Sequence, residues 1–248
     1  MNTIYILWLR QLKRYLRSKA RIVGSAAQPL LFLVALGFGF GPIYERAGGG
    51  NYIQFLAPGI IAMSILFTAV FSGIDVIWDR QFGFLKETLV APVSRFLIML
   101  GRTAGGATVA TLQGVIVFLI SLIAGFRPVS ILGVLLSIVI MFLVALLFTA
   151  LGTAIGSMLQ DMQGFQLIMN FVVMPTFFLS GALFPLQGLP TVVTWVALAD
   201  PLSYGVDALR TFLVQATHFG IVLDLAVLGA AVFALVALGG WLFSRVEA

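Results

Sequence analysis

The charged residues of this chain are spaced so unevenly that long stretches contain none at all. Six uncharged runs of 23, 28, 24, 33, 38 and 20 residues lie between Arg21 and Arg245. An ionised side chain at the centre of a bilayer costs about 2.5–3.5 kcal/mol, and about 20 apolar residues cross the hydrocarbon core. The spacing therefore predicts an all-α polytopic membrane protein with six transmembrane helices.

We expect one span for each run, and the proposed bounds are 22–44, 53–77, 103–124, 131–157, 166–184 and 221–243. The 38-residue run is too short for two spans and a turn, and Pro185, Gly188 and Pro190 interrupt its second half. Residues 1–21 are predicted to form a cytoplasmic interfacial helix, and residues 22–248 the six-span transmembrane domain. No small-residue cleavage site is visible near the N-terminus, so the first span is expected to be retained.

Composition excludes several classes of protein. With 61% hydrophobic and 9% charged residues, the chain has too little polar surface for a soluble enzyme. The net charge of +5 is too thinly spread to track the phosphates of a nucleic acid. With one histidine and no cysteine, metal clusters, disulfides and thiolate sites are not expected, and neither is a catalytic or cofactor-binding residue.

The distribution of positive charge predicts the orientation. Six spans place both termini on one side, and if that side is cytoplasmic, eleven Lys and Arg residues fall on the inner segments and three on the outer ones. Inner segments are enriched in Lys and Arg in membrane proteins. We therefore expect a multi-pass protein of the cytoplasmic membrane with both termini cytoplasmic.

Residues 3–19 have the pattern of an amphipathic helix. At 100° per residue, apolar side chains such as Trp8 and Leu12 share one side, and cations such as Arg10 and Arg14 share the other. Such a helix lies in the membrane interface with its cations near anionic headgroups. It is either a topology anchor or an elbow that braces the first span.

Residues 79–95 mix charges of both signs with Phe82, Phe84, Leu85 and Leu89. The segment is too polar to span the membrane, and Pro92 ends any helix that begins near its start, while Ser94 can cap the next helix. One interpretation is a short interfacial connector. The other is a cytoplasmic helix whose Phe and Leu side chains enter a groove on a partner protein. Composition leaves both open.

Residues 186–219 are expected to form an outer re-entrant or surface helical segment before span six. Asp200 followed by Pro201 is typical of an N-cap and the first helical position. The predicted helix carries Tyr204, and Asp207 and Arg210 stand three residues apart, where the two side chains are able to pair.

The predicted spans contain few polar groups that could bind a ligand or an ion. Gln28, Gln113 and Asn170 are neutral, and each is either an interhelical hydrogen-bonding group or a ligand contact. The scarcity of charge at mid-membrane speaks against an ion-coupled secondary carrier, which remains the alternative function. In span five, a set of side chains either lines a translocation path or faces lipid: Asn170, Met174, Phe177 and Phe178.

Two small-residue motifs, Gly101-x-x-x-Gly105 and Gly152-x-x-x-Gly156, allow helices to approach closely. The partner helix lies either within the chain or in a second copy. The chain has no Gly-x-x-x-x-Gly-Lys-Ser/Thr motif, so we do not expect it to bind ATP through a P-loop.

Residues 83–95, Gly-Phe-Leu-Lys-Glu-Thr-Leu-Val-Ala-Pro-Val-Ser-Arg, are similar to a loop of the drug-resistance and nodulation lipooligosaccharide exporter permeases. Residues 200–204, Asp-Pro-Leu-Ser-Tyr, with Asp207 and Arg210, and residues 179–185, Leu-Ser-Gly-Ala-Leu-Phe-Pro, also resemble segments of that family. Over essentially its whole length the chain resembles the membrane subunit of a type-2 ABC exporter.

The resemblance implies a partnership. Such permeases work as two membrane subunits with two separate ATPase subunits that bind ATP and Mg²⁺, so this chain is not expected to be an enzyme by itself. The resemblance implies a homodimer that meets around spans one and five, and an amphiphilic substrate such as a drug, a lipid or a glycolipid or polysaccharide. It also assigns coupling to the ATPase to six residues: Arg80, Phe84, Leu85, Lys86, Glu87 and Leu89.

Overall fold

The computed structural model describes residues 2–84 and 92–245. Within these ranges all the regular secondary structure is α-helical, which confirms the predicted fold class. The helices are α1 (Asn2–Arg17), α2 (Lys19–Arg46), α3 (Tyr52–Phe71), α4 (Ile74–Gln81), α6 (Arg95–Ile123), α7 (Ile131–Met158), α8 (Met162–Leu179), α9 (Thr191–Ala199), α10 (Pro201–Val214) and α11 (Ile221–Ser244).

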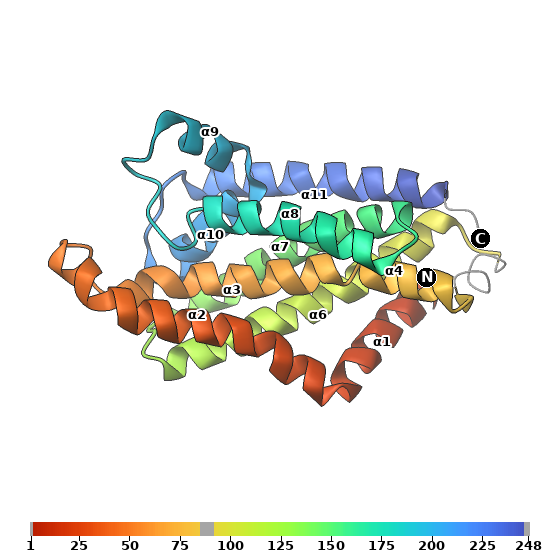
Figure 1. Cartoon of the computed structure of the whole chain (residues 1–248), viewed down its shortest axis with the longest axis horizontal. Helices are drawn as coiled ribbons and strands as arrows, with labels where there is room; N and C mark the ends of the chain where they lie inside the picture. The colour runs from red at the N-terminus through yellow and green to blue at the C-terminus, as the bar shows by residue number, and fades with distance from the viewer. Residues whose placement is uncertain (1, 85–91, 246–248) are drawn as a thin grey trace.

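Six helical stretches among the described residues are long and apolar enough to cross a membrane, as the charge spacing predicted. Five are the single helices α2, α6, α7, α8 and α11, and the sixth is α3 together with α4. The most buried of them, α3 and α6, form the centre of the bundle with α7, whereas α2, α8 and α11 cover it and expose most of their surface (Figure 1).

The two ends of the bundle differ. The beginning of α1, the end of α11 and the whole of α4 lie together at what we call the termini end (Figure 1). The short helices α9 and α10 lie at the opposite end. The predicted caps are present at both ends: the Ser94 side chain accepts a hydrogen bond from the Leu97 amide of α6, and Asp200 accepts one from the Leu202 amide of α10.

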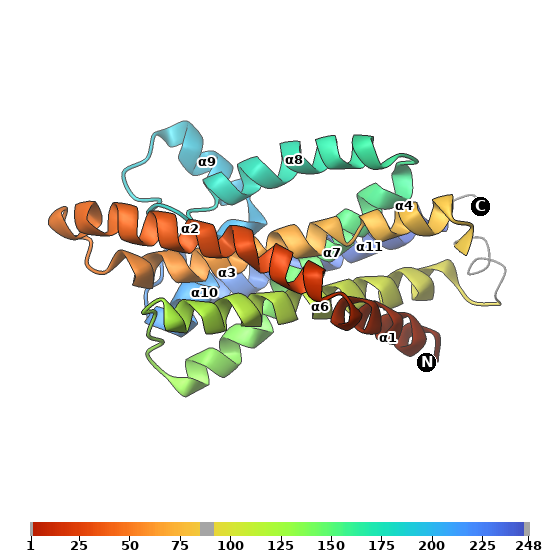
Figure 2. The same cartoon turned by 60° about the horizontal axis from the view of Figure 1, so that its bottom comes forward.

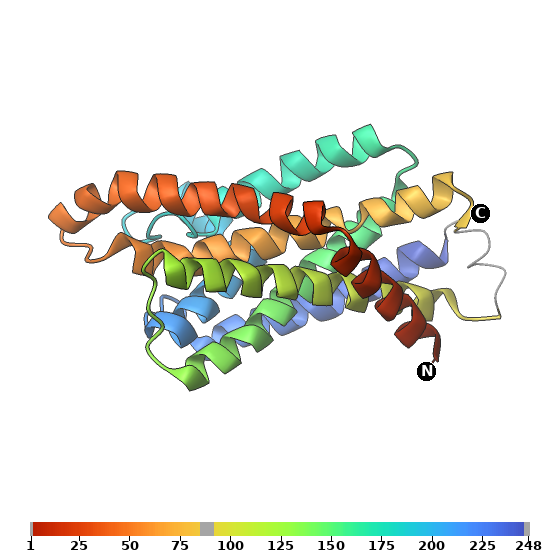
Figure 3. The ribbon, with the colours of Figure 1, turned by 90° about the horizontal axis from the view of Figure 1, so that it is seen from below.

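The amphipathic pattern predicted that α1 lies in the membrane interface. In the structure α1 packs against the bundle. It crosses α6 (Figures 2 and 3) and turns sharply into α2 at Ser18, so that α1 and α2 form a V (Figure 1). The Trp8 indole donates a 2.9 Å hydrogen bond to the Thr108 hydroxyl, and the Tyr15 hydroxyl donates one of 2.6 Å to Gln113. The apolar face of α1 thus packs against protein.

Both small-residue motifs are used inside the chain. A Cβ added at Gly101 would lie 3.0 Å from the Cβ of Leu7, so the first motif brings α6 close to α1. A Cβ at Gly152 would lie 2.2 Å from the carbonyl oxygen of Val70, and one at Gly73 would lie 2.1 Å from the carbonyl oxygen of Gly152. The second motif therefore brings α7 into backbone contact with the short break between α3 and α4.

Candidate functional site

Helix α4 leads into the predicted docking segment, and two carboxylates on it are buried. Asp79 accepts two hydrogen bonds from the Arg10 guanidinium, at 2.9 and 3.2 Å, and a third from Arg102. Asp75 is paired with Arg14. Asp75 and Asp79 are only 4% and 5% exposed. We call these five residues the ion cluster, and it joins α4 to α1 and to α6.

The ion cluster differs from what the sequence suggested. Asp75 and Arg102 are both buried, and their salt bridges are to Arg14 and Asp79. The cations of α1 were expected beside lipid headgroups. The signal that could have found these pairs is a shared spacing, since Arg10 and Arg14 stand four residues apart, as do Asp75 and Asp79, and such residues share a helix face.

Arg80 connects α4 to a third helix. Its guanidinium donates hydrogen bonds to the carbonyl oxygens of Leu159 at 2.8 Å and Ser157 at 2.9 Å, at the end of α7. The last carbonyl groups of a helix have no partner within the helix, and a cation satisfies both their hydrogen bonds and the helix dipole. Arg80 therefore holds the last turn of α4 to the end of α7.

Two of the six residues assigned to coupling by the resemblance can be placed. Arg80 lies on α4, and the ring of Phe84 lies under Arg10, whose Cζ is 3.8 Å from the ring centroid. Phe84 is thus tied to the ion cluster through Arg10. The other four, Leu85, Lys86, Glu87 and Leu89, lie outside the described residues.

At the opposite end, α10 begins as predicted and packs into the bundle. Asp200 caps it, Pro201 occupies the first helical position, and the Tyr204 hydroxyl donates a 2.8 Å hydrogen bond to the Leu198 carbonyl. Helix α10 packs against α3, α7 and α11, which fits a re-entrant segment. Burial raises the pKa of the Asp200 carboxyl from its ordinary 3.8 to about 7, while the hydrogen bond from the Leu202 amide opposes that rise.

Among the described residues Asp207 and Arg210 form no salt bridge with each other, although their spacing allows one, and each side chain has other hydrogen-bond partners. Asp207 accepts hydrogen bonds from the amides of His218 and Phe219, at 2.8 Å for the shortest bond to each, and closes the turn before α11. Arg210 donates a 2.8 Å hydrogen bond to the Gly181 carbonyl and stacks over the ring of Phe55. The two residues hold α10 to different neighbours.

Comparison with known proteins decides the family. The profile of the ABC-2 type transporter family matches residues 2–214, which is most of the chain. The chain belongs to this family. It is 31% identical to nodulation protein J of Rhizobium leguminosarum bv. trifolii over 210 residues, which cover 83% of this chain and 76% of that protein. It is also 31% identical to the putative transport permease ycf38 of Porphyra purpurea over 197 residues, or 78% of this chain and 68% of that protein.

The family assignment confirms the resemblance drawn from residues 83–95 and 200–204. As a member of the ABC-2 type transporters, the chain is a transport subunit of the membrane, and its family works with an ABC ATPase.

The predicted path-lining residues of this ABC-2 permease are not all on one face of α8. Asn170, Met174 and Phe178 stand four residues apart, and all three are exposed on the outer face of the bundle. Phe177 is buried and meets the ring of Phe32 on α2 edge-on, with 6.3 Å between centroids. Their place on a translocation path stays a prediction.

The arrangement at the termini end can transmit force. Helix α4 is attached to α1 and α6 through buried ion pairs and to α7 through Arg80. Buried ion pairs add little net stability, but removing one partner of such a pair costs about 3–5 kcal/mol. Moving α4 away from α6 would break the buried Asp79–Arg102 pair, so these contacts favour movement of α4 together with its neighbours.

Proposed function

We propose that this chain is the membrane subunit of an ATP-driven exporter, moved by a separate ATPase that docks on the cytoplasmic segment 79–95. The observation that carries the proposal is the attachment of α4 to three other helices by Asp79, Arg102 and Arg80. A partner that pushes on the segment after α4 would act on the centre of the bundle rather than on a free loop.

In this proposal the termini end is cytoplasmic, and the complex contains two permease copies and two ATPases. ATP and Mg²⁺ are bound by the ATPases. The outer faces of α2 and α8 meet across the dimer; large apolar side chains are exposed there, such as Phe38 on α2, at 64%, and Phe171 on α8, at 82%. Twelve helices enclose a path for a large molecule more readily than six.

The proposed substrate is an amphiphile, namely a drug, a lipid or a glycolipid or polysaccharide. The apolar interior of the bundle favours a molecule with a large apolar part, since unpaired charge is costly there. The match to the ABC-2 type transporter family supports a transport subunit.

Co-purification tests the partnership. A candidate ABC ATPase from the same genome is co-expressed with the chain, and the complex is isolated through a tag on the permease. We expect a stoichiometric ATPase with the unaltered chain and with Glu45→Gln, an exposed residue at the other end of α2. We expect loss of the ATPase with Glu87→Gln or Phe84→Ala. Equal recovery with all four proteins, or ATP-independent transport by the permease alone, would refute the proposal.

The absence of cysteine from the chain allows the orientation and the dimer to be tested directly. A cysteine at Lys86 is expected to react with a membrane-impermeant maleimide only in inverted vesicles, and one at Arg46 only in intact cells. Reaction of the Lys86 position from outside would place the docking segment beyond the reach of an ATPase. Single cysteines at Phe38 and Phe171 are expected to form intersubunit disulfides, and a control at the exposed Phe233 of α11 is not.

A further inference from the structure

A buried carboxyl group at the start of α11 forms no salt bridge within the described residues. Asp224 lies in the first turn of α11 and is 0% exposed. Neither of its oxygens has a hydrogen-bond partner among the described donors. An ionised carboxyl group buried in this way is costly, and such residues are rare within membrane spans. Asp224 therefore needs an explanation that the fold alone does not supply.

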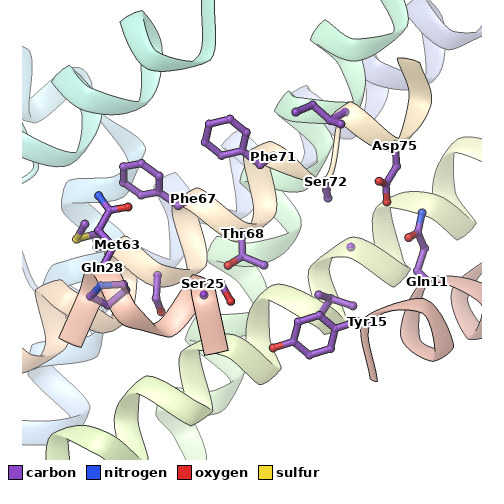
Figure 4. Close-up of a pocket in the computed structure, with 16 residues that line it drawn as sticks. Gln11, Tyr15, Ser25, Gln28, Met63, Phe67, Thr68, Phe71, Ser72 and Asp75 are labelled. Atoms are coloured by element: carbon purple, nitrogen blue, oxygen red, sulfur yellow. The ribbon is translucent and has the colours of Figure 1, made fainter. Parts of the chain in front are cut away.

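The buried carboxylates at the termini end have a different environment. Asp79 and Asp75 each accept hydrogen bonds from arginine side chains of α1. Asp75 also lines a cavity of about 360 Å³ between α1, α2 and α3, where it lies near Gln11 (Figure 4). Arginine stabilises the charged form of both carboxyl groups. No arginine does so for Asp224 within the described part of the chain.

The side chain within hydrogen-bonding reach of Asp224 is another carboxyl group, that of Asp207 on α10. We call Asp207 and Asp224 the carboxyl pair. Asp207 accepts hydrogen bonds from three donors of the turn before α11, namely the backbone amides of His218 and Phe219 and the hydroxyl of Thr217. Carboxylate oxygens accept hydrogen bonds and do not donate them. A hydrogen bond within the pair therefore requires a proton on one of its members.

The surroundings assign this proton to Asp224. The three donors of the turn all bond to Asp207, and the charge of Arg210 also acts on Asp207. Tyr204 lies near Asp224, but its hydroxyl donates to the Leu198 carbonyl instead. Hydrogen bonds and a nearby cation stabilise a carboxylate, whereas burial without them stabilises the protonated acid. Asp207 is thus the charged member of the pair and Asp224 the neutral one.

The helices packed against α11 bring few other titratable groups. Residues 131–158 of α7 include none. On α6, Arg95 bonds to the last turn of α11 and Arg102 belongs to the ion cluster, so both lie at the termini end. His218, in the turn, and Asp200, which caps α10, lie at the same end as the carboxyl pair. These two groups have to be separated from the pair by experiment.

We infer that Asp224 holds a proton at neutral pH and donates a hydrogen bond to the Asp207 carboxylate, so that the carboxyl pair is a proton-binding site that joins α10 to α11. Release of the proton would leave two like charges in contact in a buried site. Their repulsion would move Asp207 away from the amides of His218 and Phe219 and open the turn. In the proposed function this end faces the outside, so the turn would respond to external pH, but proton binding does not depend on that function.

Hydrogen exchange of the purified permease in nanodiscs tests the inference without the ATPase. The readout is the protection of the His218 and Phe219 amides, corrected for the pH dependence of exchange in an unfolded peptide. Between pH 6 and pH 9 we expect protection to fall by about tenfold or more, because release of one proton changes an equilibrium by up to about tenfold per pH unit. Asp224→Asn has an amide donor that does not titrate, so we expect no such fall in this variant.

Two further variants separate the neighbouring groups. Asp200→Asn removes the other buried carboxyl group at this end, and His218→Gln removes the imidazole but keeps the backbone amide that is measured. Both keep the carboxyl pair, so we expect the same fall with pH as in the unaltered chain. Equal protection of the unaltered chain at pH 6 and pH 9, the same fall in Asp224→Asn, or loss of the fall in either control would overturn the inference.

Infrared spectroscopy detects the proton itself and does not depend on the opening of the turn. At pH 7 the difference spectrum between the unaltered protein and Asp224→Asn should contain the carbonyl stretch of a protonated carboxyl group. The matched control is Asp161→Asn, which replaces an exposed carboxylate and should remove carboxylate bands only. Loss of carboxylate bands alone in Asp224→Asn would overturn the inference.

Discussion

Replacing Asp79 by asparagine should destabilise the bundle, because it removes the common acceptor of the ion cluster. Asp79 accepts hydrogen bonds from Arg10 and Arg102, whose side chains are 32% and 3% exposed. Arg10 can recover water when its partner is neutralised. Arg102 cannot, since two of its nitrogens already have no partner among the described residues.

The cost follows from that difference. Removing one partner of a buried ion pair costs about 3–5 kcal/mol. For a chain of this size about 1 kcal/mol moves the melting temperature by roughly 2–4 °C, so we expect Asp79→Asn to lower it by on the order of 10 °C. The measurement is thermal unfolding of the purified protein in detergent, followed by the loss of the monodisperse peak in size-exclusion chromatography.

A control and a rescue make the prediction specific. Asp161→Asn changes an exposed carboxylate that caps α8, and asparagine caps as well, so we expect a change within about 2 °C. The double variant Asp79→Asn with Arg102→Met should regain most of the loss, because the buried charge is gone. If Asp79→Asn melts with the unaltered protein, or if the double variant is no more stable than the single one, the reasoning about the ion cluster is refuted.

Three further outcomes can be measured in the same way. Gly152→Val should prevent folding, because its Cβ would lie 2.2 Å from the Val70 carbonyl oxygen. Gly229→Val, whose added Cβ would meet nothing within 4 Å, should fold. A monodisperse Gly152→Val protein would contradict this prediction. Burial raises the pKa of Asp200 to about 7 in the folded chain, so the folded state binds the proton more tightly, and its contribution to stability is full below pH 4 and is lost as the pH rises to about 7. Asp200→Asn should therefore lessen the fall in melting temperature between pH 5 and pH 8. An unchanged dependence of the melting temperature on pH would refute the raised pKa of Asp200. Arg80→Gln should cost about 1.5–3 kcal/mol through its lost carbonyl contacts, and an unchanged melting temperature would show that they contribute nothing.

The charge-free runs were sufficient to predict the number of spans and the all-α class, because the cost of a charge in lipid dominates every other preference. The helix caps could be predicted equally well, because the side chains of Ser94 and Asp200 accept hydrogen bonds from amides only two or three residues later. Both signals are local in the sequence, and neither needs knowledge of which helix lies beside which.

The partners of charged side chains could not be predicted from such local signals. Asp207 and Arg210 are close in sequence, but each is held by residues of another segment, such as His218 and Gly181. The cations of α1 looked suited to lipid headgroups because the sequence gives no distance between Arg10 and Asp79, which are 69 residues apart. Pairing across that separation depends on how the helices pack.

The position of α1 has a consequence for the order in which the chain is assembled. Arg10 and Arg14 leave the ribosome well before the carboxylates of α4 that they finally neutralise, and before the helix that carries Arg102. During that interval its amphipathic sequence allows the first helix to bind the bilayer surface. The contacts of α1 with α4 and α6 can therefore form only after the second and third spans have been synthesised, which makes the docking of α1 a late step of assembly.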